Sequence, residues 1–348
     1  MKILLVNPPD VDSSLFDYAT AKRGRANNYP AYGLGVLARH LLNHGHQPVI
    51  LNLNHEILKL VAMSTGPIDY DYAWKFILEA NLDHYQPQVI GVTCLFSVTG
   101  TSLIKVCQYV KTLTQVPLCI GGVHVTHDVE NILKDTGADY AFLNESEKDF
   151  IRFLEVLEGK SQEPLVQVIS KDGQKHLAKL IPEAEELDVI PPFEMMDVEN
   201  HSLFGTLGSW YGFVYKTTRV ATALSNRGCR AHCSFCNVRS FNGVGVRQRS
   251  IDSVLDELQI LKDRGIGHII WLDDDLLMHE DRAVALFDGM VKKNLNMTWD
   301  ATNGVIAASL KNDVVAAAAA SGCIGLALGI ESGNEQILRE IKKPGTPR

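Results

Sequence analysis

Ser225-Asn226-Arg227-Gly228-Cys229-Arg230-Ala231-His232-Cys233-Ser234-Phe235-Cys236 is the stretch that decides the fold, because it places three cysteines at intervals of four and three residues. It follows an apolar run, Arg219 to Leu224, that is typical of a strand, and a basic, glycine-containing segment comes after it. A loop in this position can direct three sulfur atoms towards one centre.

Three cysteines so close together are typical of metal ligands, because reducing compartments keep thiols free and thiolates bind soft metals. A zinc site normally closes with four protein ligands. A cubane iron–sulfur cluster normally takes four thiolates, so three would leave one iron open to an external ligand. Two alternatives stay open at this point: a zinc knuckle with His232 or Cys323 as the fourth ligand, and three unrelated buried thiols.

The pattern Cys-x3-Cys-x2-Cys, with an aromatic residue just before the last cysteine and a strand before the loop, resembles the radical S-adenosylmethionine (SAM) superfamily. In that family the methionine amine and carboxylate of SAM chelate the open iron, and an electron from the cluster splits SAM into methionine and a 5′-deoxyadenosyl radical. The resemblance implies Cys229, Cys233 and Cys236 as ligands of a 4Fe-4S cluster, and Phe235 beside the adenine.

Periodicity predicts four strand–helix units in this half of the chain, and therefore a parallel, barrel-like sheet with its site at the carboxyl ends of the strands. The family usually has six such units, and only four precede the segment 342–348. We therefore expect a fragment, a truncated gene or half of a split enzyme, and the sequence does not choose among these. The predicted strands are 220–225, 268–272, 297–301 and 324–330, and the predicted helices are 251–263, 282–292, 313–320 and 335–341.

Two further motifs follow predicted strands of this half. Asp273-Asp274-Asp275 stands where the family generally has a Gly-Gly-Glu run that takes the SAM amine, which implies that this run, with Asp274 at its centre, holds that amine or a substrate. A magnesium site and a helix N-cap cluster are the alternatives. Glu331 and Ser332 belong to a Glu-Ser-Gly segment that the family places near the SAM ribose and methionine, and an ordinary helix N-terminus is the alternative.

Basic residues crowd around the three cysteines. They could balance thiolates or hold a carboxylate or phosphate of SAM or substrate, and ordinary solvated arginines are the alternative. The residues are Arg227, Arg230, Arg239, Arg247 and Arg249.

In the N-terminal half, short apolar strands alternate with helices, which predicts a parallel, doubly wound sheet. Ligands of such sheets lie at the carboxyl ends of the strands. We expect strands at 2–6, 47–53, 89–93, 118–120 and 140–143, helices at 33–43, 72–85, 102–112, 129–135 and 150–157, and a loop from 10 to 28.

This half resembles the cobalamin-binding domain that precedes many radical SAM domains, through Asn7-Pro8-Pro9, the run from Tyr29 to Gly35, and Asn144-Glu145-Ser146-Glu147. The last motif departs from the family's Gly-Glu-Gly-Glu. No histidine occurs from Asp10 to Tyr29, so the resemblance implies cobalamin bound without a histidine ligand. A flavodoxin-like domain that has lost the cofactor is the alternative. The residues implied around the corrinoid are Thr93, Leu95, Ser97, Gly121, Gly122 and His124.

The fold prediction is therefore α/β, with three parts along the chain. A flavodoxin-like, cobalamin-binding domain covers 1–160, and an incomplete radical SAM barrel covers 216–348. Between them, 161–215 contains a hairpin around Lys171-Asp172-Gly173 and a linker at 187–192.

Composition narrows the class of protein. The 348 residues carry a net charge of −8, which argues against broad binding to nucleic acid or anionic membranes. No apolar run approaches the ~20 residues that span a bilayer, and the apolar run at the start is shorter than that of a signal peptide, so we expect a cytoplasmic protein.

The cysteines of the N-terminal half lie outside the motif. Cys94, Cys107 and Cys119 fall in predicted core elements, where a free cysteine packs as a small apolar residue. No cysteine closely follows the first strand, which disfavours a tRNA-directed methylthiotransferase.

These observations lead to one hypothesis and two rivals. The leading hypothesis is a cobalamin-dependent radical SAM methyltransferase that acts on an unactivated carbon, with a small-molecule substrate and an electron donor of the flavodoxin or ferredoxin type. A radical SAM cyclase or rearrangement enzyme of the same architecture is the first rival. A non-catalytic cobalamin-binding module is the second.

Overall fold

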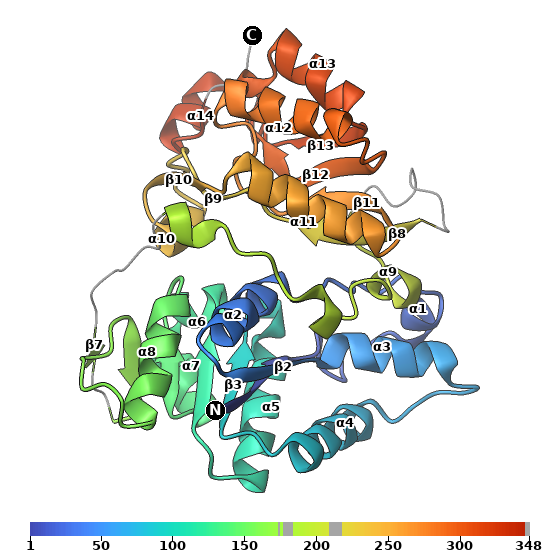
Figure 1. Cartoon of the computed structure of the whole chain (residues 1–348). Coiled ribbons are helices and arrows are strands. Elements are labelled where there is room, and N and C mark those ends of the chain that lie inside the picture. Colours follow the sequence, from blue (N-terminus) through green and yellow to red (C-terminus); the bar gives the residue numbers. More distant parts are fainter. Residues whose placement is uncertain (173–174, 177–183, 209–217, 345–348) are drawn as a thin grey trace. The chain divides into compact units, whose positions relative to one another are not determined.

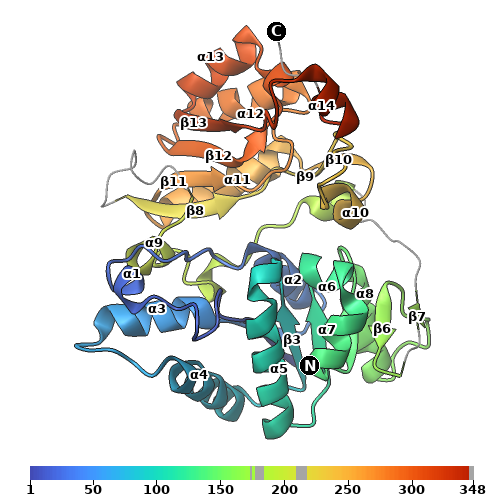
Figure 2. The same ribbon diagram turned by 180° about the vertical axis from the view of Figure 1, so that it is seen from behind.

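The computed structural model describes residues 1–172, 175–176, 184–208 and 218–344, which form two compact units (Figure 1; Figure 2 from behind). The first unit consists of Met1–Pro182, Pro191–Val198 and Leu203–Thr206, and the second of Glu183–Ile190, Glu199–Ser202 and Leu207–Arg348. The described part of the expected connection 161–215 is therefore shared between the two units.

The first unit contains a sheet in the order β2-β1-β3-β4-β5-β6-β7. The first five strands are parallel and have the flavodoxin order 2-1-3-4-5, as predicted. β6 and β7 add an antiparallel hairpin where the sequence predicts one, and residues 173–174 and 177–180 of that prediction lie outside the described residues. The strands are β1 (Lys2–Asn7), β2 (Gln47–Asn52), β3 (Val89–Thr93), β4 (Leu118–Gly121), β5 (Tyr140–Phe142), β6 (Val168–Ser170) and β7 (Lys175–His176).

Helices cover both faces of this sheet. Leu4 and Val6 of β1 belong to one buried cluster with residues of α3, α4, α5 and α7, whereas Ile3 and Leu5 belong to another with residues of α2 and α8. Alternate residues of one strand thus enter opposite cores, as the period of two requires. The helices are α1 (Tyr18–Lys22), α2 (Tyr32–Asn43), α3 (Leu53–Met63), α4 (Tyr70–Tyr85), α5 (Gly100–Leu113), α6 (Val123–His127), α7 (Val129–Thr136) and α8 (Glu147–Leu157).

The second unit is built on a four-stranded sheet in the order β13-β12-β11-β8, all parallel. This confirms the predicted series of four strand–helix units. A separate two-stranded sheet, β9 with β10, lies between the first strand and the first helix of the series. The strands are β8 (Arg219–Ala223), β9 (Asn226–Cys229), β10 (Gly245–Gln248), β11 (Ile266–Trp271), β12 (Thr298–Val305) and β13 (Cys323–Leu328).

α11, α12 and α13 of this unit pack on one face of the sheet. Phe287 of α12 stacks on Trp299 of β12 at 4.8 Å between ring centroids, and Trp271 of β11 meets Trp299 edge-on at 6.4 Å. On the other face, Ile270 packs with Val220 and Leu207. The helices are α9 (His201–Phe204), which the two units share, α10 (Val238–Asn242), α11 (Ile251–Asp263), α12 (Glu280–Lys292), α13 (Asn312–Ala320) and α14 (Glu335–Glu340).

Three expectations need correction. The predicted loop from 10 to 28 contains α1, because the Asp17 carboxylate accepts hydrogen bonds from the amides of Ala19 and Thr20 and so caps a short helix. Asn52 caps α3 in the same way, so the second strand ends one residue before its predicted end and a helix that the sequence does not predict begins. The third correction is the pair β9–β10, where only a loop was predicted.

Among the described residues, no helix combines the length and the apolar character needed to cross a bilayer.

Candidate functional sites

The three cysteines of the motif lie on a hairpin, called here the cysteine hairpin, that comprises β9, β10 and the loop between them (residues 226–248). β9 and β10 are antiparallel, with Cys229 opposite Gly245 and Asn226 opposite Gln248. Gly228 has a φ of +93°, and a Cβ there would lie 2.4 Å from the Gly245 carbonyl oxygen. Only glycine allows this approach of the two strands.

All three cysteines are free thiols, two of them half-buried and Cys236 exposed. The Ala231 amide donates to the Cys229 sulfur at 3.4 Å, and the Cys236 amide donates to the Cys233 carbonyl at 3.2 Å. Burial raises the pKa of Cys229 to about 11, and the nearby charges of Asp275, Asp274 and Cys236 act in the same direction. Burial also raises the pKa of Cys233. Cys229 and Cys233 therefore favour the neutral thiol unless a positive centre is bound beside them.

The donor set fits a cluster better than a single metal ion. Within the described residues, no group of three or more His, Cys, Asp or Glu side chains is placed to hold one ion. Cys323 is the first residue of β13, at the amino edge of the parallel sheet, whereas the hairpin follows the carboxyl end of β8. His232 pairs with Arg239 at 3.0 Å. The position of Cys323 contradicts the zinc alternative that uses it as the fourth ligand, and a set of three cysteines suits a cubane that keeps one iron open.

The three consecutive aspartates after β11 do three different things. Asp273 is 2% exposed and accepts from the Ser225 amide at 2.9 Å and the Ser225 hydroxyl at 2.5 Å. Asp275 accepts from Arg230 through both carboxylate oxygens, each at 2.8 Å. Asp274, the predicted SAM contact, accepts from Asn242 of α10 at 3.2 Å. The run is not an N-cap cluster, because His279 stands at the N-cap of α12. Its three carboxylates bind separate partners in or beside the cysteine hairpin, and among the described residues no group of three such side chains is placed to hold a magnesium ion.

Glu331 and Ser332 lie in the turn between β13 and α14. Glu331 has a φ of +62°, and its carboxylate forms an ion pair with Lys343 at 3.0 Å. Asn334, not Ser332, caps α14. The Ser234 amide donates to the Ile341 carbonyl at 3.0 Å, so the end of α14 contacts the cysteine hairpin. The structure thus brings Glu331 and the cysteines together, and it adds Lys343, which sequence reasoning missed.

The five arginines near the motif differ in burial and in their hydrogen-bond partners. Arg249 is 4% exposed and forms an ion pair with Glu257 at 2.5 Å, so it is not a solvated arginine. Arg230 spans from the hairpin to Asp275 and to the Ser309 hydroxyl at 2.6 Å. Arg239 contacts His232, and Arg247 donates to the Asn242 carbonyl at 3.2 Å. Arg227 lies on β9 opposite Arg247.

In the first unit, the residues predicted around a corrinoid meet at the carboxyl edge of β3 and β4. The Cys94 amide donates to the Gly121 carbonyl at 2.8 Å, and the His124 amide donates to the Cys94 carbonyl at 3.2 Å. Gly122 has a φ of +111°, and a Cβ there would lie 2.4 Å from the Cys94 carbonyl oxygen. These contacts join the loops after the two strands directly.

Next to this junction, the loop after β3 is exposed and apolar. Leu95, Phe96 and Val98 are each more than half exposed, Thr93 ends β3 and Ser97 begins a short 3₁₀ helix. The edge adjoins the point between β1 and β3 where the strand order reverses, which is where sheets of this order bind ligands. An exposed apolar loop beside glycine backbone is suited to a large, flat and partly apolar ligand.

Each half of the chain contains a region that matches a known domain family. The B12 binding domain family matches residues 23–154, and the Radical SAM superfamily matches residues 224–348. The chain therefore contains both a B12-binding domain and a radical SAM domain. Both matches agree with the resemblances that the motifs had suggested.

Two curated relatives match this chain over almost its whole length. Cytidylyl-2-hydroxyethylphosphonate methyltransferase of Streptomyces wedmorensis is 26% identical over an alignment of 375 positions. The alignment covers 99% of this chain and 67% of the relative. An uncharacterized methyltransferase of Pyrococcus horikoshii is 25% identical, over 100% of this chain and 69% of the relative.

The fold is similar to that of TsrM, a radical SAM methyltransferase from Kitasatospora setae solved with cobalamin and a [4Fe-4S] cluster. The TM-score is 0.75 at 18% identity, and the match covers 100% of this chain and 64% of TsrM. The chain therefore spans less than two thirds of TsrM and about two thirds of the two curated relatives.

Proposed function

We propose that this protein is a cobalamin-dependent radical SAM methyltransferase that methylates an unactivated carbon of a small molecule. The observation that carries the proposal is the placement of three free cysteines, spaced as the superfamily requires, on a hairpin at the carboxyl end of a parallel sheet. A B12-binding domain in the same chain and full-length similarity to methyltransferases support the choice of reaction.

On this proposal, the residues of the second unit bind the cluster and SAM. Cys229, Cys233 and Cys236 would supply thiolates, and the exposed ring of Phe235 would stack beside the adenine. Asp274 would accept hydrogen bonds from the SAM amine. Glu331 and Ser332, joined to the cysteines through α14, would orient the ribose and methionine.

The residues of the first unit hold cobalamin in the same proposal. Leu95 would cover an apolar face, while Gly121 and Gly122 let the ligand approach the backbone. Thr93, Ser97 and His124 would hydrogen-bond to its polar groups, and no histidine from this domain binds cobalt. When bound, the cluster supplies one-electron reduction of SAM and cobalamin supplies the methyl group, while the protein positions both and excludes water. An electron donor of the flavodoxin or ferredoxin type would reduce the cluster.

The first test is anaerobic reconstitution with iron and sulfide, followed by a 5′-deoxyadenosine assay with dithionite and SAM. We expect iron to bind and deoxyadenosine to form in the wild type. The Cys233→Ala variant should lose both, whereas Cys107→Ala, which removes a buried thiol outside the motif, should retain them. A cluster-loaded protein that forms no deoxyadenosine would favour a non-catalytic cobalamin-binding module, and one zinc per chain without iron would exclude the cluster.

The second test addresses cobalamin and methyl transfer separately. The visible spectrum of protein purified anaerobically with cobalamin should show a corrinoid that remains through gel filtration and has no histidine on cobalt. A corrinoid that washes out would leave a radical SAM enzyme without B12. Deuterated methyl label from SAM should then enter an added substrate, whereas a cyclase would form an unlabelled product.

A further inference from the structure

The cysteine hairpin is closed at its base by direct contact between its two flanking residues. Ser225 precedes β9 and Arg249 follows β10, and the Arg249 amide donates to the Ser225 carbonyl at 3.0 Å. β9 and β10 pair with each other and with no other described strand. A two-stranded hairpin alone is only marginally stable in water, so its position depends on what holds its base.

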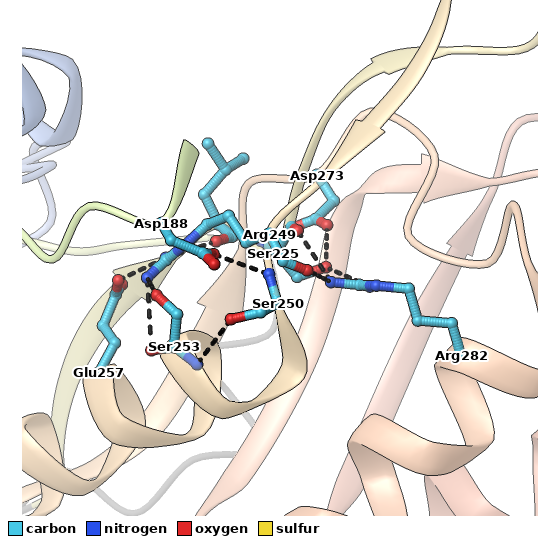
Figure 3. Close-up of polar contacts among 9 residues, drawn as sticks. Asp188, Ser225, Arg249, Ser250, Ser253, Glu257, Asp273 and Arg282 are labelled. Atoms are coloured by element: carbon cyan, nitrogen blue, oxygen red, sulfur yellow. Dashed lines mark hydrogen bonds and ion pairs between the residues drawn. The ribbon is translucent and has the colours of Figure 1, made fainter. Parts of the chain in front are cut away.

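Charged side chains from three other elements converge on this base (Figure 3). Arg282 of α12 donates from Nη2 to the Arg249 carbonyl at 2.8 Å and to the Ser225 carbonyl at 3.1 Å. Asp273, after β11, accepts from the Ser225 amide and from the Ser225 hydroxyl, which Arg282 also contacts at 3.4 Å. One guanidinium therefore connects both ends of the hairpin, and one carboxylate fixes the first end.

The Arg249 side chain anchors the second end to α11. Its guanidinium donates to Glu257 at 2.5 Å, to the Ser253 hydroxyl at 2.8 Å and to the Leu224 carbonyl at 2.9 Å. The next residue, Ser250, donates its amide to Asp188 at 2.7 Å. Figure 3 shows these groups gathered around the Ser225–Arg249 contact.

Burying so many ionisable side chains at one place costs solvation free energy, and a structural or functional reason is needed for it. Asp273, Arg249 and Glu257 are each at least 96% buried, and buried ion pairs such as Arg249–Glu257 contribute little net stability compared with apolar residues of the same volume. They do specify geometry, because charged donors and acceptors tolerate few alternative arrangements. Here Arg282 and Asp273 bind the backbone of Ser225 and Arg249, the two residues that flank the hairpin.

We propose that Arg282, together with Asp273, is a positioning residue for the cysteine hairpin, which it holds in the orientation that presents the three thiols before any cluster is bound. Arg282 contacts no cysteine. It acts through the two carbonyls at the base of the hairpin, while the Arg230–Asp275 pair restrains the loop nearer the thiols. The inference rests on the proposed function only where it connects the positions of the thiols with the properties of a bound cluster.

Hydrogen–deuterium exchange on the metal-free, full-length chain tests the positioning directly. In Arg282→Met, we expect amides of β9 and β10 to lose about tenfold or more of their protection, while those of β8, β11 and β12 keep theirs. Arg282→Lys should restore part of the loss, since an ammonium still donates to carbonyls. Arg264→Met, which removes another part-buried arginine paired at 2.6 Å with Glu199, should leave the hairpin unchanged.

A milder variant keeps the test decisive if Arg282→Met unfolds. Ser225→Ala removes the hydroxyl bond to Asp273 but no charge, and it should loosen the hairpin in the same local pattern. Unchanged hairpin protection in Arg282→Met, or in Ser225→Ala if Arg282→Met unfolds, would overturn the proposal, and so would equal loss of protection across the whole unit.

The cluster gives a second, independent readout. After reconstitution, Arg282→Met should bind less iron and show a broadened electron paramagnetic resonance signal, with partial recovery in Arg282→Lys. A signal identical to the wild type in every Arg282 variant would contradict the positioning role. Failure of the wild type to bind any cluster would instead reject the proposed function, and the exchange result would still stand.

Discussion

At the residue scale, Gly122 shows how one backbone position can join two loops. Its φ of +111° is a conformation that other residues rarely adopt, and the Cys94 carbonyl fills the space where a Cβ would be. The hydrogen bond from His124 to the same carbonyl depends on this approach. A substitution at Gly122 therefore strains the backbone and separates the loops after β3 and β4.

We expect Gly122→Ala to lower the free energy of unfolding of the first unit by several kcal/mol, because strain and a steric clash add. Gly45→Ala is the matched control: Gly45 also has a positive φ, +77°, but no atom lies within 4 Å of the position that its new methyl group would take. That variant should cost only about 1–2 kcal/mol. Urea unfolding of both proteins without cobalamin measures the difference, and equal costs would show that the close approach to Cys94 is unimportant.

At the element scale, α11 does more than cover the sheet. Its apolar residues Val254, Leu255, Leu258 and Leu261 are buried, as its periodicity predicts, but Glu257 on the same helix is completely buried as well. A charged residue can occupy that position because Arg249 reaches it at 2.5 Å. The helix thus binds the residue that ends the cysteine hairpin.

Glu257→Gln should destabilise the second unit by about 3–5 kcal/mol, because it leaves a buried guanidinium without its counter-charge. Asp256→Asn is the control on the neighbouring position, where the pair with Lys293 at 2.7 Å is exposed; its loss should cost less than about 1 kcal/mol. Urea midpoints, with exchange of the β8 and β11 amides to assign the transition, distinguish the two. Similar midpoints would mean that the buried pair is not an anchor.

At the scale of the whole molecule, the two units are not simply consecutive in the chain. Pro191–Val198 and Leu203–Thr206 belong to the first unit, although the sequence places them in the connection. Asp197 accepts from the buried His55 of α3 at 3.0 Å, and the Asn28 amide donates to the Thr206 carbonyl at 3.0 Å. The connection is therefore partly a component of the first unit.

Asp197→Ala should destabilise the first unit by about 1–3 kcal/mol, because it removes the carboxylate that accepts a hydrogen bond from His55 Nε2. Asp197→Asn should cost much less, since asparagine tolerates the φ of +50° found at this residue and still accepts a hydrogen bond. Glu194→Ala, in the same segment but with a long, exposed contact of 3.9 Å to Arg39, is the control. If thermal unfolding did not distinguish Asp197→Ala from Glu194→Ala, the segment would not stabilise the unit.

The sequence by itself determined the elements of both sheets and the two families. Strands such as Val89–Thr93 and helices such as Ile251–Asp263 were predictable because apolar periodicity reports which face is buried. The cysteine spacing and the paired glycines after β4 were readable because the chemistry of these residue types is local. The roles predicted for the SAM and cobalamin residues stay predictions that the experiments above test.

Only the tertiary structure decided how the aspartates and arginines divide their roles. Asp273 binds Ser225, Asp274 binds Asn242 and Asp275 binds Arg230, and Arg249 is buried whereas the other four arginines are partly exposed. β9 had no strand signal in Asn226-Arg227-Gly228-Cys229, and it exists because β10 pairs with it. Periodicity describes how a segment meets its core, whereas the partner of a charged group depends on residues brought near it from distant parts of the chain.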